Sequence, residues 1–210
     1  MDVNAARLLG LAALDENGGT NSCRYSTPFW KAFGGISLTS VTCHACGHTA
    51  AQYEMWHCLS LALSSQCITI EALLASSWGR EPLQDEDDKC EEPGCLVHRQ
   101  RSQETRLVRW PNILAIHLKR WKVISMVPFY QEKVPTRVTF ENVLLVESGR
   151  APYHLRGVVV HEGVAGGGHY TAFVRAPDNF WYFCNDGRPP RLAPVGEVLQ
   201  AEAYMLFYEQ

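Results

Sequence analysis

The chain has 210 residues, of which 46% are hydrophobic and 20% charged, and its 19 basic and 22 acidic side chains give a net charge of −3. A chain of this length can bury a sufficient core without disulfides, as one domain or as one with a smaller second part. The acidic balance argues against a nucleic-acid partner, and no apolar run approaches the roughly 18 residues of a membrane span. Since residues 1–10 also lack a secretory signal pattern, we expect an intracellular protein of the cytoplasm or nucleus with no membrane partner.

The first half of the chain predicts few regular elements. Residues 2–14 carry apolar side chains at helical spacing and predict a helix, and residues 20–26 predict a polar loop. Residues 33–42 alternate apolar and polar side chains and predict a strand that leads into a pair of cysteines. A second alternation over 53–63 and a helix over 68–77 follow, and residues 85–92 predict an acidic, solvated loop.

Four of the eight cysteines form two close pairs with about forty residues between them. They are Cys43, Cys46, Cys90 and Cys95. This spacing is typical of a zinc ribbon, in which four thiolates hold one ion tetrahedrally. Disulfides are the alternative, which the absence of a signal pattern disfavours. His98 could replace one sulfur, whereas Cys58 and Cys67 are expected to be ordinary buried side chains.

From residue 105 onward the sequence is mostly strand-like. The predicted strands are short, rich in β-branched and aromatic residues, and separated by Gly, Pro, Asn or Asp. They lie at 106–110, 113–118, 134–146, 153–161, 169–175, 181–184 and 203–208. The run 113–118 is almost continuously apolar, as in a strand buried on both faces. We therefore predict an α+β protein with a mainly antiparallel sheet over about 105–210 and a small zinc ribbon over about 40–98.

Two segments of the tail are candidates for chemistry. His169 follows three glycines at 166–168, which would clear space for a narrow channel beside an imidazole suited to proton transfer. Asn185 and Asp186 end the next predicted strand, where a side-chain oxygen could orient that imidazole and leave its other nitrogen to take a proton from a thiol. Alternatively, the glycines form only a flexible hairpin and the Asn-Asp-Gly run only a turn.

The ordered motifs of the chain resemble the ubiquitin-specific protease family, papain-like cysteine deubiquitinases. The family pattern Tyr-x-Leu, apolar strand, His-x-Gly and Gly-His-Tyr is matched by residues 153–155, 158–160, 161–163 and 168–170. Its Trp-x-x-Phe-Asn-Asp pattern is matched by 181–186, with Cys184 in place of Phe, and its Ala-Tyr-x-Leu-x-Tyr ending by 203–208. Residues 111–121 are similar to its Leu-Lys-Arg-Phe strand, and residues 33–47 with the later cysteine pair to its fingers. The resemblance covers about residues 29–208.

This resemblance implies a thiol protease that hydrolyses isopeptide bonds at the C-terminal glycine of ubiquitin through a thioester. It makes His169 the general base, Asn185 its orienting residue and Asp186 an adjacent acidic residue. The residues expected to bind the diglycine tail of ubiquitin are Gly166, Gly167, Gly168 and Tyr170. The implied cofactor is one structural Zn²⁺ on the two cysteine pairs, and the implied partners are ubiquitin and ubiquitinated proteins.

The family's nucleophile lies in an N-terminal Gly-Asn-Thr-Cys box that this sequence does not contain. Residues 17–25, around Cys23, are only a faint and rearranged version of it. We therefore expect a remnant helix and loop over 1–28 and the fingers and palm over 29–210, with the thumb largely missing. The chain is then either the C-terminal half of a deubiquitinase or an inactive ubiquitin-binding fragment or scaffold. An unrelated zinc-ribbon protein is the third alternative.

Overall fold

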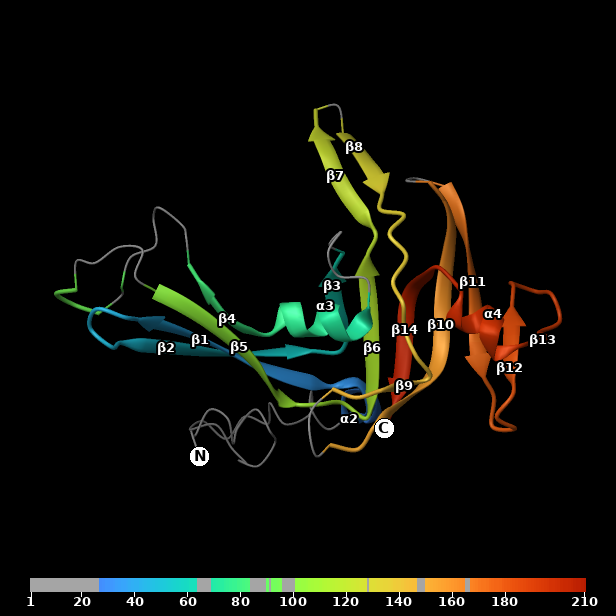
Figure 1. The fold of residues 1–210 in the computed structure, drawn as a ribbon, viewed down its shortest axis with the longest axis horizontal. Helices are drawn as coiled ribbons and strands as arrows, with labels where there is room; N and C mark the ends of the chain where they lie inside the picture. Colours follow the sequence, from blue (N-terminus) through green and yellow to red (C-terminus); the bar gives the residue numbers. More distant parts are fainter. Residues whose placement is uncertain are drawn as a thin grey trace. The chain divides into compact units, whose positions relative to one another are not determined.

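The computed structural model describes residues 27–63, 69–83, 90, 92–95, 101–127, 129–146, 150–164 and 167–210 (Figure 1). The predicted helix over 2–14, the loop over 20–26, most of the acidic loop, and Cys23, Cys67, His98 and Gly166 lie outside these residues. The chain divides into two compact units. The first comprises residues 1–57 and 76–111, and the second residues 58–75 and 112–210.

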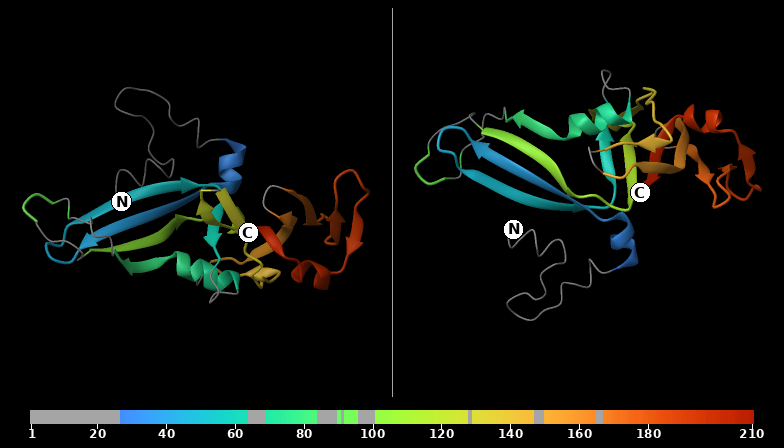
Figure 2. Two further views of the ribbon diagram at one scale, coloured as in Figure 1. Left: turned by 90° about the horizontal axis from the view of Figure 1, so that it is seen from above. Right: turned by 60° about the horizontal axis from the view of Figure 1, so that its bottom comes forward.

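The first unit is built on an antiparallel sheet with the strand order β2-β1-β5-β4, and Figure 2 shows these strands from two further directions. The strands are β1 (Gly35–Cys43), β2 (Thr49–Trp56), β4 (Gly79–Pro82) and β5 (Arg101–Arg109). A short helix, α2 (Pro28–Phe33), precedes them, and its N-terminus is capped by the hydroxyl of Thr27, which accepts from the backbone N–H of Trp30 at 3.1 Å. The predicted strand over 33–42 is confirmed as β1, where Ile36 and Leu38 are buried.

The second unit is built on a larger sheet with the order β13-β12-β11-β10-β14-β6-β3, to which β9 adds beside β10. The strands are β3 (Leu59–Ala62), β6 (Ile113–Lys119), β9 (Val143–Leu144), β10 (Tyr153–Val164), β11 (Gly167–Arg175), β12 (Trp181–Cys184), β13 (Arg191–Ala193) and β14 (Ala203–Glu209). All neighbours pair antiparallel except β3 and β6, which are parallel. The predicted mainly antiparallel sheet is therefore confirmed.

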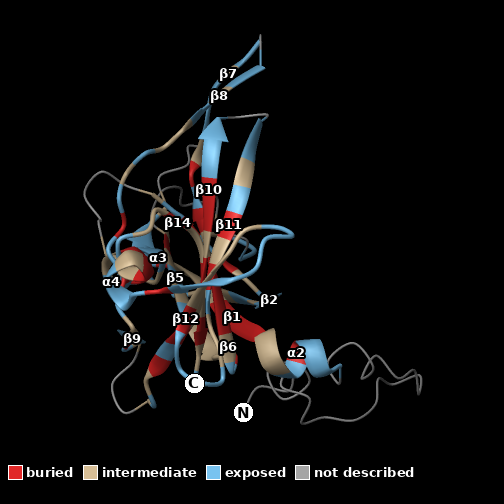
Figure 3. Cartoon of the chain, turned by 90° about the vertical axis from the view of Figure 1, so that its right-hand side faces the viewer, coloured by how far each residue is buried: buried red, intermediate tan, exposed pale blue. Residues whose placement is uncertain are grey.

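One face of this larger sheet forms the core of the second unit. Val158, Leu206 and Ile116 pair across β10, β14 and β6, and all three are fully buried. Helices α3 (Ile70–Ser77) and α4 (Val195–Leu199) contribute further buried side chains, among them Leu73 and Val198. Figure 3 shows β10 buried in its middle and exposed toward its end, the end that leads to the candidate site.

In the second unit one sequence prediction is wrong and one element was missed. The strand predicted over 134–146 is regular only at β9, because Val138 and Phe140 are buried in an irregular segment that has no continuous strand partner. A hairpin of β7 (Trp121–Met126) and β8 (Phe129–Lys133) was not predicted, because apolar and polar residues do not alternate along these two segments. Among the described residues, no helix is long and apolar enough to cross a membrane.

Candidate functional site

His169 and Asn185 meet at the end of the β10–β11 hairpin. Their strands are neighbours, with Ala172 of β11 paired to Cys184 of β12. The Nε2 atom of His169 lies 2.8 Å from Oδ1 of Asn185. Because an amide oxygen can only accept a hydrogen bond, Nε2 carries the proton and Nδ1 keeps its lone pair. The His169 side chain is 44% exposed, so this arrangement can transfer a proton to or from a ligand.

Asp186 faces the other nitrogen of the same ring. Its Oδ2 atom lies 3.8 Å from Nδ1 of His169, too far for a hydrogen bond but close enough for charge attraction. The residue occupies the left-handed region with φ +46°, which is uncommon for a residue other than glycine. The turn that requires this conformation is closed by the N–H of Arg188, which donates to the carbonyl oxygen of Asn185 at 3.1 Å. The turn therefore sets the position of the carboxylate beside the imidazole.

The described glycines of this hairpin permit close approach within it. A Cβ atom at Gly168 would lie 2.2 Å from Nε2 of His161, and one at Gly163, whose φ is +126°, would lie 2.6 Å from the carbonyl oxygen of Gly167. By contrast, a Cβ atom at Gly167 would meet open space. The packing of His161 by itself explains why residue 168 must be glycine. The expected role of Gly167 and Gly168 in binding a diglycine tail therefore stays a prediction.

A group of aromatic side chains surrounds His161, which is only 6% exposed. The ring of His161 lies 4.6 Å from that of Tyr170, its partner across the hairpin, and also contacts the rings of Trp121 and Tyr204. Tyr170 itself is half-exposed, so the group offers an aromatic surface on the face of β11 opposite to that of His169. Sequence reasoning found only Tyr170 of this group, since the others come from β7, β10 and β14 and meet only in the folded sheet.

The described cysteines of the second unit do not supply a nucleophile for His169. Cys184 pairs with Ala172, and because side chains alternate along β11, it lies on the face opposite to that of His169 and Thr171. Burial raises the pKa of the Cys58 thiol, which is the reverse of activation. Cys23 lies outside the described residues.

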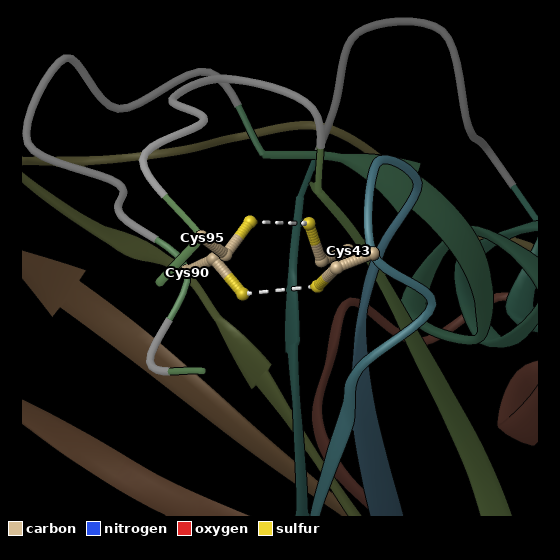
Figure 4. A group of neighbouring side chains, drawn as sticks. Cys43, Cys90 and Cys95 are labelled. Carbon is tan, nitrogen blue, oxygen red and sulfur yellow. Dashed lines mark hydrogen bonds between the residues drawn. The ribbon is translucent and has the colours of Figure 1, made fainter. Parts of the chain in front are cut away.

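The first unit brings the two predicted cysteine pairs together (Figure 4). All four sulfurs lie within 4.8 Å of one another, with Cys43 3.9 Å from Cys95 and Cys46 3.6 Å from Cys90. None of these cysteines is in a disulfide. A tetrahedral ion with metal–sulfur bonds of about 2.3 Å places its sulfurs about 3.8 Å apart. The observed spacing therefore fits a tetrahedral thiolate site.

The ionisation of these thiols also fits a cation site. The backbone N–H groups of Cys46 and Ala45 lower the pKa of Cys43 to about 6. The N–H of Glu92 lowers the pKa of Cys90, but burial and the three neighbouring thiols outweigh it and raise that pKa to about 12. Four thiolates so close together repel one another unless a divalent cation lies between them. Because the donors are soft sulfurs in a tetrahedral arrangement, the set suits zinc.

Comparison with known proteins adds to this geometry. Residues 8–208 match the family described as ubiquitin carboxyl-terminal hydrolase. Ubiquitin carboxyl-terminal hydrolase 44-B of Xenopus laevis is 33% identical over 205 residues, which cover 85% of this chain and 28% of the relative. Ubiquitin carboxyl-terminal hydrolase 2 of Gallus gallus is 30% identical over 190 residues, which cover 84% of this chain and 51% of the relative.

Solved structures share the fold. A chain of the yeast SAGA DUB module that contains a mutant Sgf73 superposes with a TM-score of 0.79 at 22% identity, covering 98% of this chain and 47% of that chain. A chain of the SAGA Ubp8/Sgf11/Sus1/Sgf73 DUB module bound to ubiquitin aldehyde superposes with a TM-score of 0.76 at 22% identity, covering 99% of this chain and 46% of that chain. The predicted α+β fold class is thereby confirmed. The chain spans between about a quarter and a half of the length of these proteins.

Proposed function

The chain belongs to the ubiquitin carboxyl-terminal hydrolase family, whose members are thiol-dependent proteases. We propose that it provides the general base for hydrolysis of the isopeptide bond at the C-terminal glycine of ubiquitin. The observation that carries this proposal is the 2.8 Å contact between Nε2 of His169 and Oδ1 of Asn185. It leaves Nδ1 of this half-exposed side chain free to accept a proton.

The reaction proceeds in two halves. First, Nδ1 of His169 takes the proton of a thiol, the thiolate attacks the glycine carbonyl carbon, and the imidazolium returns the proton to the leaving lysine amine as the thioester forms. Next, a water gives its proton to Nδ1 as it attacks the thioester, and the thiol leaves with that proton, which releases the ubiquitin carboxylate. Asn185 holds the ring in one tautomer throughout, and Asp186 stabilises the imidazolium. The thiol itself is not assigned to any described residue.

The aromatic group around His161 supports a substrate-binding role for this end of the sheet. Tyr170, Tyr204 and Trp121 offer flat apolar surface on the face of β11 opposite to His169. In this proposal the aromatic surface, together with Gly167 and Gly168, binds the slender diglycine tail of ubiquitin. Aromatic rings can pack against an extended backbone that has no side chains of its own.

The four cysteines of the first unit are proposed to hold one structural Zn²⁺. Bound there, the ion supplies a cross-link with no catalytic chemistry. The chain around the site positions two of the ligands: Cys43 ends β1 and Cys46 lies in the turn before β2. The N–H of Gly47 in this turn donates to the carbonyl oxygen of Cys43 at 2.9 Å. The cross-link would join this turn to the segment that carries Cys90 and Cys95, which stabilises a sheet with a small core.

A second candidate function is ubiquitin binding without catalysis. It is favoured by one observation, that neither Cys58 nor Cys184 is placed or activated as a nucleophile. A ubiquitin vinyl sulfone probe and calorimetric titration with ubiquitin separate the two candidates. Probe labelling that is lost in His169→Ala and kept in His154→Ala, a substitution at an exposed histidine of β10, supports the protease. Binding without labelling supports the second candidate, and the absence of both refutes the two together.

A further inference from the structure

A cavity of about 680 Å³ lies in the second unit, on the face of the sheet that carries His169. The strand registers place its lining on one face, because Val160 pairs with Thr171, Phe173 with Phe183, and Phe183 with Arg191. Its floor is apolar, with Val160 and Phe173 buried. The side chains that line it have no role in the reaction described above.

The rim of the cavity carries one more negative charge than positive. Arg191 donates to Glu197 at 3.1 Å, and Lys133 pairs with Glu202 at 3.0 Å. Glu162 also lines the cavity and, within the described ranges, forms no ion pair. The rim therefore leaves one carboxylate for a cation from outside the chain.

The chain's own Arg191 shows what this lining recognises. Its guanidinium lies 4.5 Å from the ring centroid of Phe183 and is bound at the same time by Glu197. An arginine or lysine needs the same two features, an apolar surface for its stem and a carboxylate for its head. The other part of the cavity also has an apolar floor, formed by Val160 and Phe173, and it is lined by the carboxylate of Glu162.

The position of Glu162 connects the cavity to the reaction. Glu162 is the direct cross-strand partner of His169, and such partners have Cβ atoms about 4.5–5.5 Å apart. His169 must protonate the lysine amine that leaves, so the ubiquitinated protein passes this face, whereas the aromatic surface proposed for the ubiquitin tail lies on the other face. We propose that the cavity binds an arginine or lysine side chain next to the ubiquitinated lysine of the substrate protein. This inference rests on the proposed function.

The test uses ubiquitin joined through a non-hydrolysable isopeptide mimic to a fluorescent lysine peptide. The peptide carries either arginine or its neutral isostere citrulline beside the linkage, and affinity is measured by fluorescence anisotropy. We expect the arginine conjugate to bind about 2–5-fold more tightly than the citrulline conjugate, as for a partly exposed ion pair. Glu162→Gln should abolish this ratio, and Glu54→Gln, the same charge change on an exposed residue of β2, should keep it.

Each outcome decides the proposal. Equal affinities of the two conjugates for the wild-type chain overturn it even where ubiquitin binds well. If Glu162→Gln lowers the affinity for ubiquitin without a peptide as much as it lowers the affinity for the conjugate, the cavity binds ubiquitin and not the substrate protein. If ubiquitin does not bind at all, the proposed function fails instead. In that case amide shifts of Thr171 and Phe173 on titration with the free arginine peptide, against the citrulline peptide, decide the cavity alone.

Discussion

Replacing Arg120 by methionine should destabilise the second unit strongly. The Arg120 side chain is only 1% exposed, and its guanidinium is surrounded by backbone carbonyls. Nε donates to the carbonyl oxygen of Ala203 at 2.7 Å, and Nη1 donates to those of Val134 at 3.2 Å and Thr136 at 2.8 Å. Glu202 lies 3.7 Å from Nη1. Arg120 therefore joins the start of β14 to the segment that follows the β7–β8 hairpin.

The size of the effect follows from these contacts. Arg120→Met fills a similar volume but leaves three carbonyls without their donor, and each costs about 1–3 kcal/mol if it stays buried. Removing one partner of a buried charged network costs about 3–5 kcal/mol in comparable cases. Both estimates agree near 3–5 kcal/mol, a large part of the roughly 5–15 kcal/mol by which a domain is stable. The guanidinium's own burial, which lowers the pKa of Arg120, offsets part of this cost.

The assay is urea unfolding followed by circular dichroism, with hydrogen exchange of the amides of β14 as the local readout. Arg120→Met should lower the unfolding free energy by about 3–5 kcal/mol, and the melting temperature by about 6–20 °C. Arg137→Met makes the same chemical change at an exposed position and should stay within about 0.5 kcal/mol of the wild type. If the two substitutions have the same effect, or Arg120→Met costs less than about 1 kcal/mol, the carbonyl contacts do not carry this stability.

Three further predictions concern the site, the cysteine cluster and the core. Asn185→Ala should free the imidazole of His169 to adopt either tautomer, so long-range nitrogen-15 spectra that show only the Nε2–H form in the wild type should show a mixture; an unchanged spectrum contradicts the assigned role. Cys46→Ser should release one equivalent of zinc to a chromogenic chelator from the purified chain, whereas Cys58→Ser should keep it bound; equal retention by both variants would exclude the cluster as the zinc site. Burial raises the pKa of Tyr153 to about 12, above its unfolded value near 10, so the unfolded state loses this proton first and stability should fall as the pH rises from about 10 to 12. Tyr153→Phe should reduce that slope in alkaline urea titrations, and an identical slope would refute the burial argument.

The sequence by itself determined those features of the fold and the site that depend on residues close together along the chain. The two cysteine pairs are each local, and their separation alone predicted a cluster of four thiols. His169 lies in β11 and Asn185 directly follows β12, the next strand along the chain, so an antiparallel pairing of the two strands brings them near each other. The almost continuous apolar run at 113–118 predicted a strand buried on both faces, and in β6 the successive side chains of Leu114, Ala115 and Ile116 are all buried.

The tertiary structure alone decided the features that depend on which strands become neighbours. Periodicity shows which side chains share a face but not the partner strand, so the aromatic group around His161 could not be foreseen from positions 121, 161 and 204. The burial of Arg120 runs against the usual preference of a charge for water, and it requires three carbonyls from segments distant in sequence to converge on one guanidinium. The same holds for the cavity beside His169. Its lining comes from four adjacent strands, Lys133 of β8 and the segment around α4, and it becomes a single surface only when those strands pair.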